Sequence, residues 1–341
     1  MNNQSIYKQV VFCSLVLLLV VSGQLSARSS SSRRPRMGLY GDWEIKVQFG
    51  ERAMTSILSF SRDEKGNRTG QWISFWGVTD LKDVKFEENK LSFVQVVRFG
   101  ENEFTSSFSG TIEDGKLAGT LSSDRGESKV EGKRSRRMPR AAGKWEMKYT
   151  VGERERTSTL LVKVDKEGEL TADWQSERVQ SEITDVNYER GVLTFTRKSK
   201  MQDREWESTF EGRIERETGV LSGTIKSDRG EIKAEGTRIG AALIGTWNLE
   251  MTSERGARNQ RLRVNPDMSA LYGTIPIKQV SFEDGKVSFK IVMEFGERKF
   301  ESSFAGKLAD SKLTGEVTSS RGTSKVAGKK VVRTFRRPPT R

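Results

Sequence analysis

The side chains that could do chemistry in this chain are few in kind. The sequence has no histidine, and its only cysteine is Cys13. A Ser-His-Asp triad, a Cys/His zinc site and a disulfide framework are therefore excluded, and so is a thiol nucleophile beyond the first residues. Carboxylate, tyrosine, lysine and arginine side chains are the groups left to act on a ligand or bind one. We predict no cofactor and no metal.

Paired carboxylates are the one catalytic arrangement that this composition offers. A glycosidase needs two carboxyl groups that face each other across the substrate, at about 5 Å or about 6.5–9.5 Å. The acidic pairs here alternate with Lys and Arg, which is typical of exposed strands with cross-strand ion pairs. A carboxylate-based hydrolase of polysaccharide is therefore an alternative function, with no catalytic residue assigned. The pairs are Glu87 and Glu88, Glu153 and Glu155, and Glu205 and Glu207.

Three arginines occur at the same place in a phrase that the chain repeats. The phrases SSDRGESKVEGKR, KSDRGEIKAEGTR and SSRGTSKVAGKK contain Arg125, Arg229 and Arg321, each followed by glycine. Guanidinium groups at equivalent positions could hold an anionic ligand through paired hydrogen bonds. A hairpin turn is the simpler interpretation, because glycine adopts a positive φ easily and the arginine would lie in solvent.

Aromatic residues form the second set of candidate binding positions. Trp72 and Trp174 each precede a repeated valine by twelve residues, and Tyr272 is expected at the same place further along the chain. Trp76 breaks the apolar alternation around it. Such a cluster at a barrel mouth could stack on a sugar ring or a lipid. Core filling is the simpler interpretation, because the interior of an eight-stranded barrel is just wide enough for side chains.

The first residues of the chain predict export. An apolar run over residues 10–21 follows Lys8, and small residues follow at Gly23 and Ala27. The run is shorter than the roughly 20 residues of a membrane span but is typical of a secretory signal peptide. We expect cleavage after Gly23 or Ala27 and a periplasmic or extracellular protein, with an uncleaved anchor as the alternative.

The net charge of +13 is concentrated in three short segments. Residues 28–37, 133–140 and 329–341 carry four, five and six basic residues and no acidic residue. The rest of the mature chain is close to neutral. We therefore predict no nucleic-acid binding, because a domain that reads nucleic acid carries its basic stripe on the fold itself. The basic ends could instead contact a membrane or wall surface peripherally, or serve as disordered tethers.

The body of the chain consists of three repeats of about a hundred residues. Each opens with Gly-x-Trp, at Trp43, Trp145 and Trp247. Apolar residues then alternate with polar ones, as at Trp43, Ile45 and Val47, which predicts strands. Turn signals every 10–16 residues indicate about eight strands per repeat. The third repeat is eight residues shorter than the others in its first half.

Eight short antiparallel strands can close into a barrel that leaves no exposed edge. We predict an all-β chain of three tandem small up-and-down antiparallel β-barrels, with the opening tryptophan of each repeat across one end. A six-bladed β-propeller is the alternative, because the six half-repeats match the size of a blade. The predicted organisation is a signal peptide 1–27, a basic Ser/Arg-rich disordered segment 28–37, barrels 38–132, 141–238 and 239–333, a basic linker 133–140 and a basic tail 334–341.

Three sequence motifs carry a resemblance to a known family. The Gly-x-Trp opening, the DGKLxGT hairpin and the closing GExKxxG resemble the lipocalin-like β-barrel repeats of secreted bacterial proteins, over roughly residues 38–333. The resemblance implies the barrel fold but brings no catalytic or ligand residues with it. We expect an exported, non-enzymatic binding or interaction protein of the cell envelope, with a small apolar ligand, a sugar or an anionic envelope polymer as candidate partner. A structural spacer is a further alternative, and the oligomeric state is left open.

Overall fold

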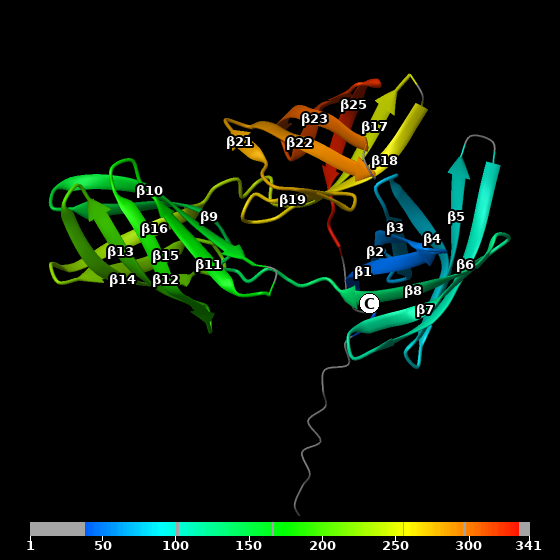
Figure 1. The fold of residues 1–341 in the computed structure, drawn as a ribbon, viewed down its shortest axis with the longest axis horizontal. Helices are drawn as coiled ribbons and strands as arrows, with labels where there is room; N and C mark the ends of the chain where they lie inside the picture. Colours follow the sequence, from blue (N-terminus) through cyan, green and yellow to red (C-terminus); the bar gives the residue numbers. More distant parts are fainter. Residues whose placement is uncertain (1–37, 100–101, 166, 255, 296–297, 334–341) are drawn as a thin grey trace, which may run out of the picture. The chain divides into compact units, whose positions relative to one another are not determined.

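The computed structural model describes residues 38–333, apart from residues 100–101, 166, 255 and 296–297. These residues form twenty-five β-strands and no helix. The strands make three antiparallel sheets, one for each repeat (Figure 1). The prediction of an all-β chain of tandem barrels is confirmed. The predicted signal peptide, the basic segment 28–37 and the basic tail 334–341 lie outside the described residues.

The first sheet is a closed eight-stranded barrel, drawn in blue to teal in Figure 1. Its strands follow one another in chain order, and the first pairs with the last to close the ring. The strands are β1 (Gly41–Phe49), β2 (Arg52–Arg62), β3 (Arg68–Ile73), β4 (Val78–Glu87), β5 (Lys90–Phe99), β6 (Asn102–Glu113), β7 (Lys116–Ser123) and β8 (Gly126–Arg134).

The second sheet, drawn in green, has the same order but stays open at one seam. Its first and last strands, β9 and β16, are paired as in a barrel. Among the described residues no backbone ladder joins β11 to β12, so these two strands are the sheet edges. The strands are β9 (Gly143–Val151), β10 (Arg154–Val164), β11 (Leu170–Gln175), β12 (Gln180–Glu189), β13 (Val192–Met201), β14 (Arg204–Ile214), β15 (Leu221–Ser227) and β16 (Gly230–Arg238).

The third sheet has nine strands and is open at the corresponding place. The eight missing residues fall in its first half, where three strands of only three residues occur and the two edges of the sheet lie. The strands are β17 (Gly245–Ser253), β18 (Gly256–Val264), β19 (Ala270–Tyr272), β20 (Ile275–Ile277), β21 (Ser281–Glu283), β22 (Lys286–Phe295), β23 (Arg298–Ala309), β24 (Lys312–Ser319) and β25 (Gly322–Lys330).

Strand pairing excludes the propeller. In a six-bladed propeller each half-repeat would form its own four-stranded sheet. Here the first strand of every repeat pairs with the last, as Val47 does with Val130, Tyr149 with Ala234 and Met251 with Val326. Both halves of a repeat therefore belong to one sheet.

Each sheet encloses its own apolar core. At the centre of each core two phenylalanines from neighbouring strands stack with their ring centroids 4.7–4.8 Å apart. Beside each stack two glycines face each other across the next strand pair, as Gly212 and Gly223 do, and the phenyl ring lies over them. The glycines give the ring the space that a Cβ would occupy, so this part of each barrel is filled. The stacked pairs are Phe93 and Phe108, Phe195 and Phe210, and Phe289 and Phe304.

The tryptophan that opens each repeat is fully buried. Its indole N–H donates to the backbone carbonyl four residues earlier, and a cation near the end of the same repeat lies over the ring. The three hydrogen bonds join Trp43 to Leu39 (2.8 Å), Trp145 to Ala141 (3.0 Å) and Trp247 to Leu243 (2.7 Å). The cations are Arg134, Arg238 and Lys330, at 5.5, 4.1 and 5.5 Å from the ring centroids.

Candidate functional site

The three arginines of the repeated phrase lie in exposed hairpin turns on three different sheets. The backbone N–H of each arginine donates to the hydroxyl of the serine two residues before it, at 3.2–3.3 Å. The glycine after each has a φ of 106–115°, which favours glycine. The guanidinium of Arg125 lies 4.5 Å from the ring of Phe104, and that of Arg321 lies 5.5 Å from the ring of Phe300. Turn geometry, together with ring packing for Arg125 and Arg321, accounts for these residues without a ligand, and their binding role stays a prediction.

Trp72, Trp174 and Tyr272 occupy equivalent places in the three cores. Each is paired with a leucine of the preceding strand, and each is at most 7% exposed. Burial raises the pKa of the Tyr272 hydroxyl to about 12, and that hydroxyl donates to the sulfur of Met251. Trp72 and Tyr272 are therefore core residues.

Trp76 differs from these three because it is 58% exposed. Its ring lies 4.3 Å from that of Phe75, in the segment between β3 and β4. Phe75 packs in turn against the apolar core of the third sheet. The aromatic pair is thus part of a contact between repeats, and Trp76 keeps most of its surface in solvent.

Trp174 differs from Trp72 and Tyr272 because a guanidinium lies over its ring. The guanidinium of Arg197, on β13, lies 4.6 Å from the Trp174 ring. Arg197 Nε donates to the hydroxyl of Ser208 at 3.3 Å, and the hydroxyls of Tyr149 and Ser158 lie 2.9 Å apart in the same barrel. The alternation along β9, β10, β13 and β14 turns these side chains toward the barrel interior, beyond the stacked phenylalanines. We call this group, with Ser181, Ser199 and Trp206, the mouth of the second barrel.

Arg197 is half-buried and forms no ion pair with a carboxylate in the described part of the chain. Burial lowers the pKa of its guanidinium below the usual value, an effect that Tyr149 opposes. Arginine nevertheless keeps its charge at neutral pH. The indole N–H of Trp174 is also buried and has no acceptor among the described residues. The mouth therefore combines a cation with an unused hydrogen-bond donor.

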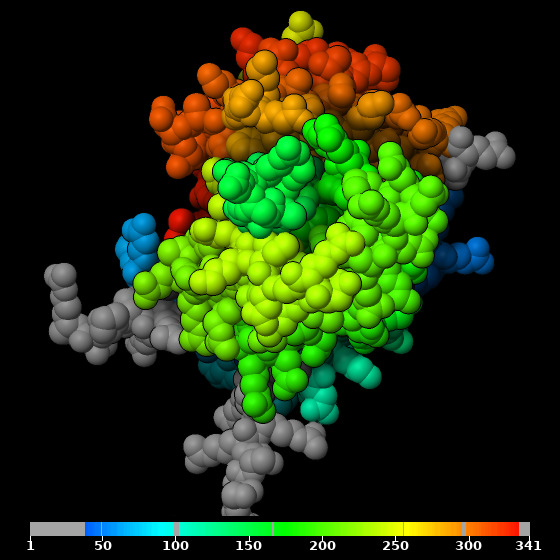
Figure 2. Space-filling model, turned by 90° about the vertical axis from the view of Figure 1, so that its left-hand side faces the viewer, coloured from blue at the N-terminus to red at the C-terminus, as the bar shows by residue number. Residues whose placement is uncertain are grey.

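An open depression of about 690 Å³ lies at the tips of β12, β13 and β14. It is lined by residues 180–182, 198–200 and 205–207, which include Ser181, Ser199 and Trp206 of the mouth. Figure 2 shows a recess in the green part of the surface, which belongs to the second sheet. The stretches that line the depression come from strand ends, where the core of stacked rings has ended, and they leave space for a small molecule.

One of the acidic pairs considered for catalysis, Glu205 and Glu207, also lines this depression. Glu205 accepts a hydrogen bond from Lys200 at 2.8 Å, and this bond lowers the pKa of its carboxyl. Glu207 is opposite Lys198 in the strand register. Both carboxylates therefore belong to cross-strand pairs with lysines, as the alternation of charges predicted.

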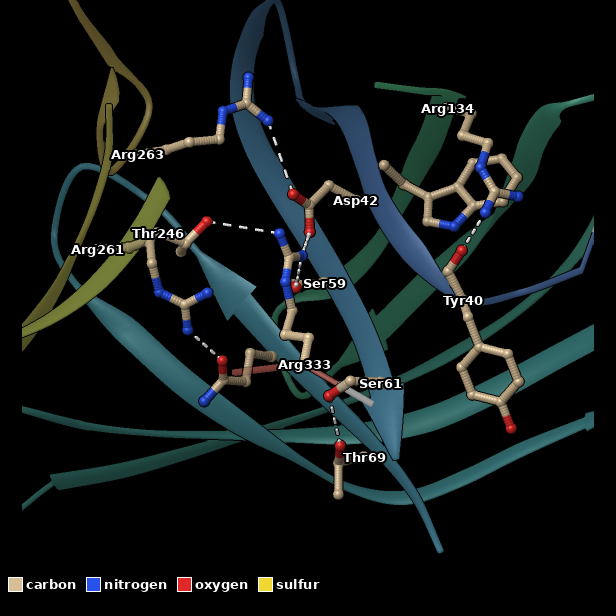
Figure 3. Close-up of polar contacts among 12 residues, drawn as sticks. Tyr40, Asp42, Ser59, Ser61, Thr69, Arg134, Thr246, Arg261, Arg263 and Arg333 are labelled. Carbon is tan, nitrogen blue, oxygen red and sulfur yellow. Dashed lines mark hydrogen bonds and ion pairs between the residues drawn. The ribbon is translucent and has the colours of Figure 1, made fainter. Parts of the chain in front are cut away.

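A second polar cluster joins residues of the first and third repeats. Asp42 forms ion pairs with Arg333 and with Arg263, the latter at 3.6 Å (Figure 3). Arg333 also donates to the hydroxyls of Ser59 at 3.2 Å and Thr246 at 3.5 Å. Burial acts to raise the pKa of Asp42, but Arg333, Ser59 and Arg263 together lower it below its usual value. The cluster pairs one carboxylate with two arginines and is a structural contact between the first and third repeats.

Arg261 extends the same contact. It is only 4% exposed and donates to the side-chain carbonyl of Gln71 on β3 (Figure 3). Burial, together with the charge of Arg333, lowers its pKa to about 10. Gln260 next to it donates to the backbone carbonyl of Phe75 at 3.1 Å. The third sheet thus holds the aromatic segment of the first through side-chain bonds to its backbone.

Sequence reasoning selected Trp174 but missed Arg197, Tyr149 and Trp206. A signal was present in the aligned repeats. Arg197 is paired with Ser208, Gln95 with Ser106 and Ile291 with Ser302, so these three residues hold one position in the three barrels. An alignment of the repeats shows a charged residue at an inward position where both other repeats have a neutral one. This difference would have identified the mouth.

Comparisons with known proteins assign no family to the chain. No protein-family description and no curated protein matches it. Among solved structures it is similar to a Bacteroides fragilis protein described as a candidate outer membrane protein, with 11% identity, 86% of this chain and 97% of that chain covered, and a TM-score of 0.23. It is also similar to a protein of unknown function from Nostoc punctiforme (10% identity, 86% and 96% covered, TM-score 0.20) and to transferrin binding protein B from Haemophilus parasuis (11% identity, 85% and 75% covered, TM-score 0.20). TM-scores this low support no functional assignment, and the resemblance to lipocalin-like repeats stays a prediction.

Proposed function

We propose that this chain is an exported, non-enzymatic binding protein of the cell envelope that takes a small ligand at the mouth of its second barrel. The observation that carries the proposal is the polar set of inward side chains around Arg197, next to an open depression of about 690 Å³. Ligand sites in small barrels lie where side chains leave the interior unfilled. Export rests on the leader-like residues 1–27 of the sequence.

We do not assign a binding site to the first or the third barrel. At three positions of the mouth their inward residues are mostly apolar. Where the second barrel has Tyr149, Arg197 and Ser199, the first has Val47, Gln95 and Val97, and the third has Met251, Ile291 and Met293. Apolar side chains at these positions extend the core toward the barrel end. A single site per chain follows from this difference.

Hydrolysis is the weaker alternative because the carboxylates at the depression lack the required properties. A general acid of a glycosidase needs a carboxyl with a raised pKa, facing a second carboxylate across the substrate. The pKa of Glu205 is lowered by Lys200 instead. Among the described residues no group of three His, Cys, Asp or Glu could hold a metal ion.

The proposal is tested with two small probes, 2-naphthoate and the neutral 2-naphthylmethanol, and purified residues 28–341. Binding of at least one probe is expected in equilibrium dialysis, with one site per chain. Trp206→Ala, which removes the half-buried ring at the mouth, should weaken binding at least fivefold, because stacking on an aromatic ring is worth about 1 kcal/mol or more. Phe104→Ala is the matched control at the equivalent position of the first barrel and should leave binding unchanged.

Three outcomes would contradict the proposal. Failure of both probes to bind would favour a structural spacer. Equal effects of Trp206→Ala and Phe104→Ala would place the ligand elsewhere. Turnover of an envelope polysaccharide that is lost on substitution of one Asp or Glu would make the protein a hydrolase.

A further inference from the structure

We infer that the mouth of the second barrel is selective for a small monocarboxylate, whose carboxylate pairs with Arg197 and whose ring or apolar body lies against Trp206. The inference rests on the proposed function and specifies the ligand class of the same site. It is carried by the position of one cation, by the donors around it and by the contrast with the two sister barrels.

The fold does not need a cation at this position. Arg197, Gln95 and Ile291 occupy one place in three barrels that share the stacked phenylalanines directly below it. Gln95 is 8% exposed and Ile291 is 3% exposed, so a neutral or apolar side chain fills this place well. A half-buried charge that lacks a carboxylate partner is costly, and the cost is relieved when an anion pairs with it.

The groups around Arg197 are donors that can form hydrogen bonds to a carboxylate. The indole N–H of Trp174 is buried without an acceptor in the described part of the chain, and the Trp174 ring lies beneath the guanidinium. The hydroxyls of Ser181 and Ser199 are 3.5 Å apart at the same end of the barrel. A planar carboxylate matches the guanidinium fork through two parallel hydrogen bonds.

The charge of the site favours a monoanion. Arg197 is the cation that lies over the Trp174 ring; Arg156, opposite Tyr149 in the register, shares the inward face of β10 but is exposed. Lys198 and Lys200 also line the depression, where they are opposite Glu207 and Glu205. The half-buried guanidinium of Arg197 pairs with one carboxylate, whereas a phosphate dianion would need a second cation, which only exposed side chains offer here. Trp206, opposite Ser199 in the register, is half-buried and offers a ring for the body of the ligand.

The test compares 2-naphthoate, 2-naphthylmethanol and 2-naphthyl phosphate by isothermal titration calorimetry at low salt. The wild-type protein should bind 2-naphthoate at least tenfold more tightly than each of the other two. Arg197→Gln gives the second barrel the residue type that the first barrel has at this position. It should remove the preference by weakening the binding of 2-naphthoate about tenfold or more. The Kd of 2-naphthylmethanol should change by less than about twofold, because the neutral probe makes no ion pair. Arg213→Gln removes the same charge from the outer face of β14 and should change nothing.

The outcomes separate this inference from the proposed function. If 2-naphthylmethanol binds as tightly as 2-naphthoate and Arg197→Gln affects neither, the anion selectivity is wrong while a binding site remains. Tighter binding of the phosphate probe also overturns the monocarboxylate class. If no probe binds, the proposed function itself fails. The unfolding temperature of Arg197→Gln is measured alongside, and a second variant, Arg197→Lys, should retain part of the preference, because lysine keeps the charge without the planar fork.

Discussion

The indole N–H of each opening tryptophan joins the start of the first strand to the chain that precedes it. In the second barrel Trp145 donates to the Ala141 carbonyl at 3.0 Å, and Arg238 covers the ring while donating to the carbonyls of Ala142 and Arg140. Burial lowers the pKa of Arg238 to about 10. The tryptophan and the cation thus tie the first and last strands to the same entering segment.

Trp145→Phe should destabilise the second barrel because it deletes the N–H and keeps most of the ring. A lost hydrogen bond with a buried partner costs about 1–3 kcal/mol. In calorimetry the transition of this barrel should fall by at least about 5 °C, given the usual shift for a domain of this size. Trp76→Phe, at an exposed ring, is the control and should shift no transition by more than about 2 °C. Equal shifts in both variants would contradict this role of the N–H.

At the scale of elements, the glycine pairs set how closely neighbouring strands approach the core ring. Gly212 and Gly223 face each other across β14 and β15. A Cβ at Gly223 would lie 2.7 Å from Phe210 Cζ and 2.6 Å from the Glu211 carbonyl oxygen. Because the latter is backbone, the clash cannot be relieved by a rotamer change.

Gly223→Ala should therefore lower the free energy of unfolding by about 1–3 kcal/mol, the usual cost of overpacking a filled core. Urea unfolding followed by fluorescence measures the change. Ser222→Ala, at the exposed neighbouring position, should stay within about 0.5 kcal/mol of the wild type. A Gly223→Ala variant as stable as the Ser222→Ala variant would mean that this region of the barrel has spare room.

Element positions were predictable from each repeat alone, whereas the site required a comparison of the three repeats. Period-two alternation from Trp43 to Val47 and turn residues such as Gly126 mark strands and hairpins, because both reflect local backbone preference. The open seam between β11 and β12 depends on hydrogen bonds between strands, and alternation within a strand carries no information about it. Arg197 was missed because one charged residue among many on alternating strands looks exposed until the register turns it inward.

At the scale of the whole molecule, the first and third repeats share a half-buried ion-pair cluster. Asp42 follows the Gly41 of the first repeat, and Arg333 lies three residues after the last strand of the third. Lys329 and Lys330 belong to β25, and Lys133 and Arg134 to β8. Part of the charge assigned to basic ends and to a linker therefore belongs to the folded strands and to this cluster.

Asp42→Asn should destabilise the protein by about 3 kcal/mol at neutral pH, because it leaves two arginines without their carboxylate. The pKa of Asp42 is lowered on folding, so its contribution is fully present above the unfolded value of about 3.9 and is lost as pH falls through the folded value. The stability difference between wild type and Asp42→Asn should thus be constant from about pH 5 to 8 and shrink below about pH 4. Asp114→Asn, in an exposed hairpin, is the control. A difference that does not change with acid would contradict the ion-pair account.

The most direct test of the ligand site is a crystal structure of residues 28–341 grown with 2-naphthoate. We predict that the carboxylate lies within hydrogen-bond distance of the Arg197 guanidinium, that the ring lies against Trp206, and that the first and third barrels contain no probe. A probe bound elsewhere, or a second barrel whose mouth is filled by its own side chains at saturating 2-naphthoate, would contradict this account.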